Sequence, residues 1–439
     1  MRGFGTLCLS IVLAASMASS ATAQFRPDPE RQARTEADYK ATLQRLGIVS
    51  MRPGADGFNK QSPNYVNYEE VRAGQPKLPQ LVTASTRGSS AWRRVRRPAL
   101  LKLLEDEMYG RVPATAPRLV WKLVEQRTAD KYGFATTVTK YRGSAPGRDL
   151  AVDLSLTLPA NRKGKLPLIL ELGFPEGFRF PGSPRPEPAD PWQGQVLRRG
   201  WGYAILVPNT IQPDDGAGLS EGVIGIAAAG KPRGLHDWGA LRAWAWGASR
   251  AYDLLSRNPG IDPDRIAIEG LSRYGKAAAV AMAFDQRFSL GFIGSSGAGG
   301  AKILRRDFGE RLENLTGSGE YHWFTPAFLN YGGPLTVNHL PVDAHTLLAM
   351  AAPRPIFVGA GMLDQDGWVD PRGSFIAARE ASKVYELLGV RGLVGSTPPA
   401  FNETRAEGMI AFRQHDGGHT NGPNWPAFLD FAARVWRGP

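Results

Sequence analysis

Residues 265–276 read Arg265-Ile266-Ala267-Ile268-Glu269-Gly270-Leu271-Ser272-Arg273-Tyr274-Gly275-Lys276. The first five residues have the pattern of a buried strand, and the alanine-rich residues 277–284 that follow have the pattern of a helix. Together they predict a strand, a tight turn of small residues and a helix. Such a turn holds the Ser272 hydroxyl at the end of a sheet, where the first amides of the helix could stabilise an oxyanion.

The spacing around Ser272 differs from the usual G-x-S-x-G pattern of nucleophilic serines. Gly275 comes three residues after the serine instead of two. The turn alone is therefore also compatible with a strand–helix connection that carries no chemistry.

The N-terminus has the three parts of a secretory signal. Arg2 gives the positive start, residues 7–18 are apolar, and Ala21-Thr22-Ala23 is an A-x-A cleavage site. We expect residues 1–23 to be a signal peptide, cleaved after Ala23, and the mature protein to be periplasmic or secreted. No later run reaches about 18 uncharged apolar residues, so we expect no membrane span.

Cysteine content and charge exclude several classes of protein. Cys8, the only cysteine, lies in the predicted signal, so the mature chain has no disulfide and no cysteine nucleophile or metal ligand. The formal net charge of +12 is spread along the chain except at residues 93–97. A basic surface attracts acidic polymers. The chain has no zinc-finger spacing or RNA-binding motif, and we expect no nucleic-acid partner.

The remainder of the chain divides into two regions. Residues 24–90 are polar without a strong period and are predicted to form an extension that packs on the core, and residues 91–439 form one catalytic domain. Three early strands are predicted to be antiparallel: 118–124, 134–141 and 150–158. Six later runs have the pattern of buried strands: 166–172, 203–208, 266–269, 290–293, 355–360 and 409–412. Helical patterns cover 92–109, 237–255 and 425–436. This order predicts an α/β three-layer sandwich with a mostly parallel central sheet, antiparallel N-terminal strands and a site at the carboxyl ends of the strands.

A serine nucleophile needs a base and an acid that orients the base, and α/β-hydrolases supply them in the chain order Ser, acid, His. Asp364, Asp366 and Asp370 follow the strand that ends at 360, and His415 and His419 follow the last strand. His419 comes after two glycines, which allow a tight loop that presents an imidazole. We therefore assign Ser272 as the nucleophile and His419 as the base, with His415 in a structural role.

Alternatives remain for several polar residues. His415, Asp416 and His419 could bind a metal, although the glycines between them argue against the helix that makes this spacing favourable. His345 has the context of an interior histidine. Arg273 could stabilise an oxyanion or pair with a neighbouring carboxylate, and Lys276 could reach the same pocket or lie on the surface. We expect neither a metal nor an organic cofactor.

Seven linked motifs resemble the glucuronoyl esterases of carbohydrate esterase family 15, especially the bacterial ones. The elbow Gly-x-Ser-Arg-x-Gly-Lys is the signature of that family, although Leu271 stands where fungal members often carry cysteine. The similarity covers the chain from about Trp92 to the C-terminus. The motifs occupy residues 270–276, 296–302, 308–310, 313–324, 352–355, 368–373 and 415–425.

The resemblance implies hydrolysis of esters that join 4-O-methyl-glucuronate on xylan to lignin alcohols, through an acyl-enzyme. It implies an oxyanion role for Arg273. It also implies that five residues bind the sugar: Lys276, Glu310, Glu320, Trp323 and Trp368. The implied partner is glucuronoxylan or a lignin–carbohydrate ester, and we expect a monomer.

The acid position departs from the family pattern. Many members carry a catalytic glutamate 23 residues beyond the nucleophile, where this chain has Ser295. We therefore place the acid on the later loop, at Asp366 first and Asp364 second, and interpret Asp370 as a residue that fixes the loop. Because a catalytic glutamate is missing here, a carbohydrate-binding pseudoenzyme is one alternative. An acetyl or other carbohydrate carboxyl esterase is another.

Overall fold

The computed structural model describes residues 28–178 and 190–437. The predicted signal, residues 1–23, lies outside this range. Among the described residues, no helix combines the length and apolar composition needed to cross a membrane.

The strands form one ten-stranded sheet in the order β1-β2-β3-β5-β4-β6-β7-β8-β10-β9. In this order, neighbouring strands from β5 through β4, β6, β7 and β8 to β10 are parallel. The pairs β1–β2, β2–β3, β3–β5 and β10–β9 are antiparallel. This confirms the predicted mostly parallel sheet with antiparallel N-terminal strands. The strands are β1 (Val120–Lys131), β2 (Phe134–Ser144), β3 (Ala151–Pro159), β4 (Leu166–Leu172), β5 (Gly202–Leu206), β6 (Ile261–Leu271), β7 (Leu290–Gly294), β8 (Ile356–Ala360), β9 (Thr404–Arg405) and β10 (Ile410–Gln414).

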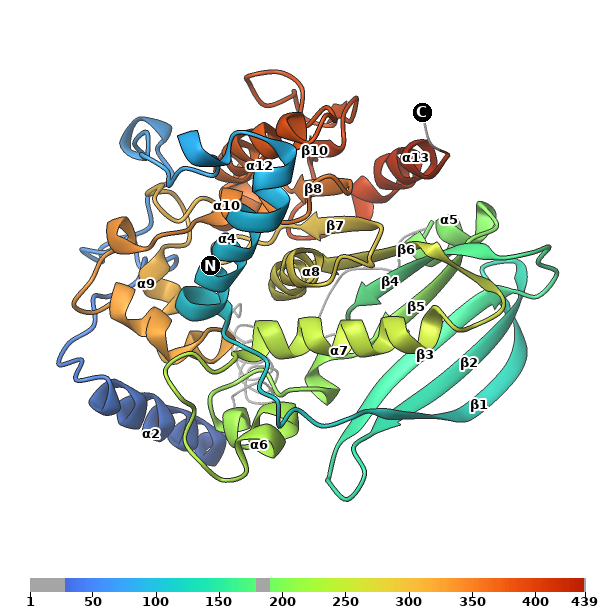
Figure 1. The fold of residues 1–439 in the computed structure, drawn as a ribbon, viewed down its shortest axis with the longest axis horizontal. Helices are drawn as coiled ribbons and strands as arrows, with labels where there is room; N and C mark the ends of the chain where they lie inside the picture. Colours follow the sequence, from blue (N-terminus) through green and yellow to red (C-terminus); the bar gives the residue numbers. More distant parts are fainter. Residues whose placement is uncertain (1–27, 179–189, 438–439) are drawn as a thin grey trace, which may run out of the picture.

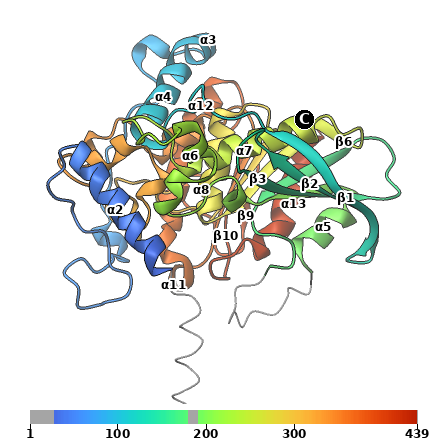
Figure 2. The ribbon, with the colours of Figure 1, turned by 90° about the horizontal axis from the view of Figure 1, so that it is seen from below.

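Helices cover both faces of the sheet. Figure 2 shows α7 and α8 on one side of the strands and α5 and α13 on the other. The helices are α2 (Pro29–Arg45), α3 (Ser89–Ala91), α4 (Arg97–Leu104), α5 (Trp192–Arg198), α6 (Gly222–Ala228), α7 (Ala240–Leu255), α8 (Arg273–Phe284), α9 (Leu312–Leu315), α10 (Ala344–Ala349), α11 (Leu363–Asp366), α12 (Pro371–Leu387) and α13 (Trp425–Trp436). The helix predicted over 92–109 is interrupted by two π-helical segments, Trp92–Arg96 and Glu105–Tyr109.

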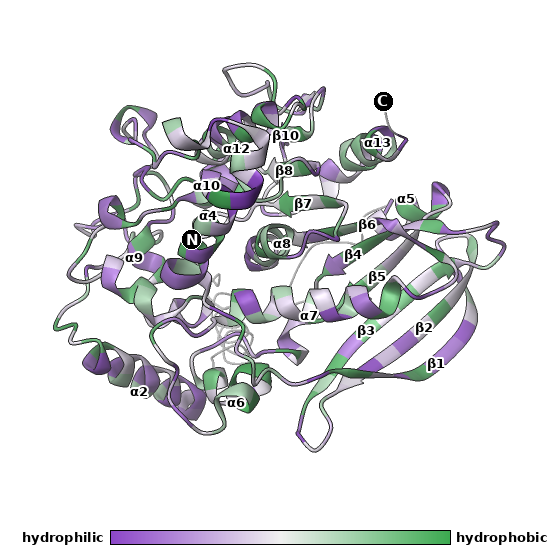
Figure 3. Cartoon of the chain, viewed as in Figure 1, coloured by the Kyte–Doolittle hydropathy of each residue, from purple (hydrophilic) through white to green (hydrophobic). Residues whose placement is uncertain are grey.

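Alternating side chains of the central strands supply two hydrophobic cores. In β4, Leu168 and Leu170 pack into the larger core with α7 and α8, and Ile169 packs into a smaller core with α5 and α13. Successive residues of a strand point to opposite faces, so a strand buried on both faces is apolar throughout. Figure 3 shows β7 as hydrophobic, in contrast to a mostly hydrophilic α2.

The segment before residue 91 contains a helix that lies against the loop at residues 215–221. Helix α2 begins after Asp28, whose side chain accepts a hydrogen bond from the amide of Glu30, and Pro29 occupies its first turn. Both features are typical of helix N-termini. Figure 1 shows α2 along one edge of the molecule, near α6 and far from β1. This helix was not predicted, because the sequence has few apolar residues in this segment.

The register of the sheet brings four chain segments to one edge. Leu271 pairs with Gly294, Gly294 with Gly359, and Ala360 with Gln414. The residues that follow these strands therefore emerge side by side at the carboxyl edge. They belong to the loops on which the sequence placed the nucleophile, the acid and the base.

Candidate active site

Ser272 lies at a sharp bend between β6 and α8. Its φ of 61° and ψ of −129° lie in a region that L-residues rarely adopt. Strain of this kind persists where the surrounding structure enforces it, and it is typical of nucleophile elbows. The amide of Ser272 donates to the carbonyl of Gly294 at 2.9 Å, which anchors the bend to the end of β7. The side chain is half-buried at the edge of the sheet.

The glycines on both sides of the bend are required by close backbone contacts. A Cβ at Gly270 would lie 2.3 Å from the carbonyl oxygen of Tyr274, and one at Gly275 would lie 2.6 Å from that of Gly294. Neither position can accept a side chain without a backbone shift. Helix α8 approaches the end of β7 at Gly275, three residues after Ser272. This approach explains why the second glycine of the turn stands at that position.

His419 and Asp366 contact each other across two loops. Nδ1 of His419 lies 2.6 Å from Oδ1 of Asp366, whose side chain is 1% exposed. An ionised carboxylate only accepts hydrogen bonds, so Nδ1 carries the hydrogen and Nε2 keeps a lone pair. The ring of His419 is 39% exposed, so it can receive a proton from a bound reactant.

The second oxygen of Asp366 is held by two further donors. Oδ2 accepts a hydrogen bond of 2.6 Å from the hydroxyl of Ser295 and one of 2.7 Å from the amide of Gly361. Ser295, which follows β7, therefore occupies the sequence position of the missing glutamate and binds the aspartate that follows β8. Sequence reasoning missed this role, although β7 and β8 were both predicted and polar residues at the ends of adjacent strands can meet.

The other two acidic candidates lie in different surroundings. Asp364 is exposed on α11. Asp370 is fully buried and accepts hydrogen bonds from Nε of Arg306 at 2.9 Å and from the amide of Gly373 at 2.9 Å. It caps the first turn of α12, in agreement with the predicted loop-fixing role.

The remaining histidine alternatives have local partners. Nε2 of His415 lies 2.8 Å from the carbonyl of Thr420, and Nδ1 accepts from the amide of Gly417 at 3.0 Å. Both ring nitrogens of His415 thus hold the loop of His419, which leaves neither for a metal. His345 is buried, with Nε2 2.8 Å from the carbonyl of Pro79. Among the described residues, no three His, Cys, Asp or Glu side chains are grouped so that they could hold a metal ion.

Arg273 forms an ion pair with the carboxylate of Asp214. Its side chain is 46% exposed beside the elbow, so the pairing leaves part of the guanidinium accessible. Burial lowers the pKa of Arg273, but the neighbouring Asp214 raises it by more, so its pKa lies above the usual value. The sequence offered pairing and oxyanion binding as alternatives, and this geometry accommodates both.

Lys276 is buried next to the elbow and is not a surface lysine. Its Nζ donates to the carbonyl of Ala298 at 2.6 Å and to Oε2 of Glu310 at 3.1 Å. The same Nζ lies 5.1 Å from the centre of the Trp323 ring, and Cζ of Arg273 lies 5.6 Å from it. The two cations on the first turn of α8 thus share one aromatic ring.

Glu320 completes a pair of carboxyl groups in this cluster. Burial and the charge of Glu310 raise the pKa of Glu320 to about 8. Its Oε2 is buried and has no hydrogen-bond partner among the described residues. Near neutral pH the protonated carboxyl can therefore donate a hydrogen bond, whereas Glu310 beside Lys276 accepts.

Trp368 borders the same region through its backbone and ring. Its carbonyl accepts from the amide of Glu310 at 2.8 Å. The segment before residue 91 reaches the indole, because a Cβ at Gly57 would lie 3.1 Å from Cζ3 of Trp368. The five residues predicted to bind the sugar therefore lie in one cluster. Glu310 contacts Lys276 and Trp368 and acts on the charge of Glu320, and Lys276 lies against the ring of Trp323.

This fold and elbow are those of an α/β-hydrolase. A family model described as fungal glucuronyl esterase matches residues 233–389. A solved glucuronoyl esterase of carbohydrate esterase family 15 from Teredinibacter turnerae is 42% identical, with a TM-score of 0.85, and the match covers 92% of this chain and 100% of that one. The chain belongs to the glucuronoyl esterases of carbohydrate esterase family 15 and is a carboxylic ester hydrolase.

Two curated relatives extend the comparison. The carbohydrate esterase MZ0003, from an unknown prokaryotic organism, is 29% identical over 405 residues, which is 84% of this chain and 92% of the relative. The 4-O-methyl-glucuronoyl methylesterase of Hypocrea jecorina is 38% identical over 168 residues, which is 36% of this chain and 35% of that enzyme. The match to the fungal enzyme thus spans about a third of each protein.

Proposed function

We propose that the protein hydrolyses esters between the carboxyl group of 4-O-methyl-glucuronate on xylan and lignin alcohols. The observation that carries this proposal is the cluster of Lys276, Glu310, Glu320 and Trp323 next to Ser272. Fixed hydrogen-bond donors and acceptors beside an aromatic ring suit a sugar ring, whose hydroxyls point in set directions. The curated name of the fungal relative, a 4-O-methyl-glucuronoyl methylesterase, supports the same substrate class.

The reaction proceeds through an acyl-enzyme. The hydroxyl of Ser272 attacks the ester carbonyl, and Nε2 of His419 takes its proton. Arg273 stabilises the negative oxygen of the tetrahedral intermediate. As the intermediate collapses, the alcohol leaves with the proton from His419. Water then attacks the acyl group in the same manner, which releases the uronic acid and restores Ser272.

Asp366 keeps His419 in the tautomer that this sequence of steps requires. Its hydrogen bond to Nδ1 leaves the lone pair of Nε2 directed at the reaction and stabilises the imidazolium that forms. Ser295 and Gly361 hold the carboxylate in place through its second oxygen.

A comparison of two substrates tests the proposed specificity. We expect kcat/KM for benzyl glucuronate to exceed that for an acetylated xylose by at least about 100-fold, because the sugar-binding residues contribute only when the uronate carries the carbonyl. Faster release of acetate would favour the acetylesterase alternative. Absence of turnover with both substrates would favour the pseudoenzyme.

Removal of the Ser295 hydroxyl tests its support of Asp366. We expect Ser295→Ala to lower kcat about tenfold, since one hydrogen bond to a charged group is lost and the amide of Gly361 remains. The matched control is Ser296→Ala, because the hydroxyl of Ser296 accepts from the amide of Ala301, whereas the described partners of the Asp366 carboxylate are Ser295, Gly361 and His419. Equal kcat values for the two variants and the wild-type protein would contradict the role of Ser295.

The raised pKa of Glu320 predicts a pH-dependent KM. Below about pH 8 the neutral carboxyl donates a hydrogen bond to the substrate, and above it the group ionises beside Glu310 and loses that hydrogen. We expect KM for benzyl glucuronate to rise about fivefold between about pH 7 and pH 9, the effect of one neutral hydrogen bond. Glu320→Gln, whose amide does not titrate, should remove this rise. A rise of equal size in the variant would exclude Glu320 as its cause.

We also propose that the protein is exported and acts as a monomer. The export proposal rests on the proposed substrate, a polymer that lies outside the cytoplasm. N-terminal sequencing of protein secreted by its host should find Gln24 first.

A further inference from the structure

Asp214 links three side chains that surround the elbow. It lies in the loop between β5 and α6, and its side chain is 10% exposed. Oδ2 pairs with Arg273, and Oδ1 accepts from Nε1 of Trp323 at 2.6 Å and lies 3.0 Å from Nε2 of His322. The rings of Trp323 and His322 thus fix one oxygen of Asp214, and the other oxygen pairs with Arg273.

The charge of Asp214 is maintained in this setting. Burial favours its neutral form, but the bond to His322 and the charge of Arg273 outweigh burial and hold the pKa of Asp214 below its usual value. An ionised acceptor forms the stronger hydrogen bond to a guanidinium.

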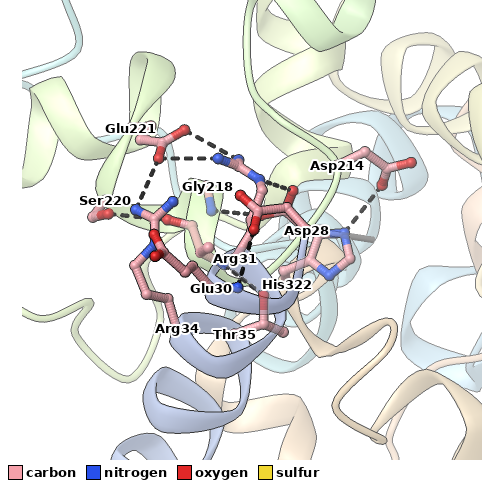
Figure 4. Close-up of polar contacts among 12 residues, drawn as sticks. Asp28, Glu30, Arg31, Arg34, Thr35, Asp214, Gly218, Ser220, Glu221 and His322 are labelled. Carbon is pink, nitrogen blue, oxygen red and sulfur yellow. Dashed lines mark hydrogen bonds and ion pairs between the residues drawn. The ribbon is translucent and has the colours of Figure 1, made fainter. Parts of the chain in front are cut away.

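Helix α2 holds the loop that carries Asp214. Arg31 pairs with Asp215 at 2.5 Å through Nε and with Glu221 at 3.1 Å through Nη2. Thr35 accepts from the amide of Ala217 at 3.0 Å. Figure 4 shows Arg31 of α2 between the polar groups of this loop, with Asp214 and His322 beside them.

The same helix also holds the segment that supplies the two rings. The hydroxyl of Tyr321 donates to Oδ2 of Asp38 at 2.6 Å, and Tyr321 begins the short helical turn Tyr321–Trp323. The ring of Tyr321 packs against Tyr39 with 4.9 Å between centroids. Helix α2 therefore contacts both segments that form the surroundings of Asp214.

We propose that Asp214 is a positioning residue for Arg273, and that α2 stabilises this position by holding the two segments around Asp214. The inference rests on the proposed oxyanion role of Arg273. A half-exposed arginine has many rotamers, and donors stabilise a transition state best when they need no reorganisation. Asp214 restricts the guanidinium to one place beside Ser272, with its remaining N–H groups available to the oxyanion.

A double-mutant cycle on kcat tests the role of Asp214. We expect Arg273→Gln to lower kcat by about 100-fold or more and Asp214→Asn by about tenfold, with inhibition by free glucuronate unchanged in the Asp214 variant. Asparagine preserves the shape and an acceptor for Trp323, so the fold should remain. The double variant should be no slower than Arg273→Gln, because asparagine keeps the acceptor for Trp323 and the substitution therefore affects kcat through the arginine.

Three outcomes would overturn the proposal for Asp214: an unchanged kcat in Asp214→Asn, a further tenfold loss in the double variant, or a weakened affinity for glucuronate that matches the loss in kcat. An unchanged kcat in Arg273→Gln would instead refute the oxyanion role on which the inference rests, so the two failures are distinguishable.

Matched arginines on α2 test the role of the helix. Arg31→Met should lower kcat about threefold at temperatures well below unfolding, and Arg34→Met should not. Arg34 is 54% exposed, and its one ion pair among the described residues is with Glu221 at 3.3 Å. Thr35→Val is the second variant if Arg31→Met does not fold. A lowered Tm with unchanged kcat in the variant that folds would assign α2 to stability alone.

Discussion

Ser272→Ala is expected to lower kcat for a glucuronoyl ester by about a millionfold, the loss typical of removing the nucleophile from a serine hydrolase. Alanine can adopt the same strained φ of 61° as serine, so the free energy of unfolding should change little. The residual rate would reflect substrate binding and Arg273 alone. Steady-state kinetics with benzyl glucuronate, together with thermal unfolding, measures both quantities.

The matched control for this prediction is Ser249→Ala. Ser249 is a half-buried serine of α7 whose hydroxyl donates to the carbonyl of Ala245 at 3.2 Å, inside the helix. Its removal should leave kcat unchanged. A Ser272→Ala variant that retained more than about a thousandth of the wild-type kcat would show that another group attacks the ester.

Asp366→Asn has the second largest expected effect, a loss of about 10⁴ in kcat. The asparagine amide would turn an N–H toward Nδ1 of His419, which favours the tautomer that carries its hydrogen on Nε2. That tautomer cannot accept the proton of Ser272. Because asparagine matches aspartate in size, the loss should lie in kcat with little change in KM.

Asp364→Asn is the control for Asp366, since both residues belong to α11 and Asp364 is exposed. We expect kcat to stay within about twofold of the wild-type value, as is usual for an exposed substitution away from bound groups. A larger loss in Asp364→Asn than in Asp366→Asn would reassign the acid.

Much of the fold could be predicted because the central strands are buried on both faces. Their apolar runs, separated by helical patterns, indicate a parallel sheet without any knowledge of which strands pair. The pairing itself could not be predicted, because β5 lies between β3 and β4 and nothing in the run 203–208 distinguishes this place. Helix α2 was missed because its residues are mostly hydrophilic, although Asp28 and Pro29 form a recognisable N-terminus.

Some residues of the candidate site could likewise be predicted from the sequence, and others could not. Ser272 and His419 each follow a predicted strand, so their positions in the sequence were enough to select them. Position left Asp364, Asp366 and Asp370 as candidates for the acid, and the contact with His419 distinguishes Asp366. Asp214 lies in a long loop without a motif, and its importance depends on the tertiary contact with Arg273. The role of Ser295 likewise depends on the distance between two loop ends, which no spacing along the chain records.

The central claim is that Ser272 carries the glucuronoyl group during turnover. Rapid acid quenching of the enzyme during hydrolysis of benzyl glucuronate, followed by peptide mass spectrometry, tests it most directly. We predict that the peptide containing Ser272 gains the mass of one glucuronoyl group, and that this adduct is absent in Ser272→Ala. A glucuronoyl adduct on a different residue would contradict this claim. So would an acetyl adduct on Ser272 with acetylated xylose if benzyl glucuronate gives no adduct there.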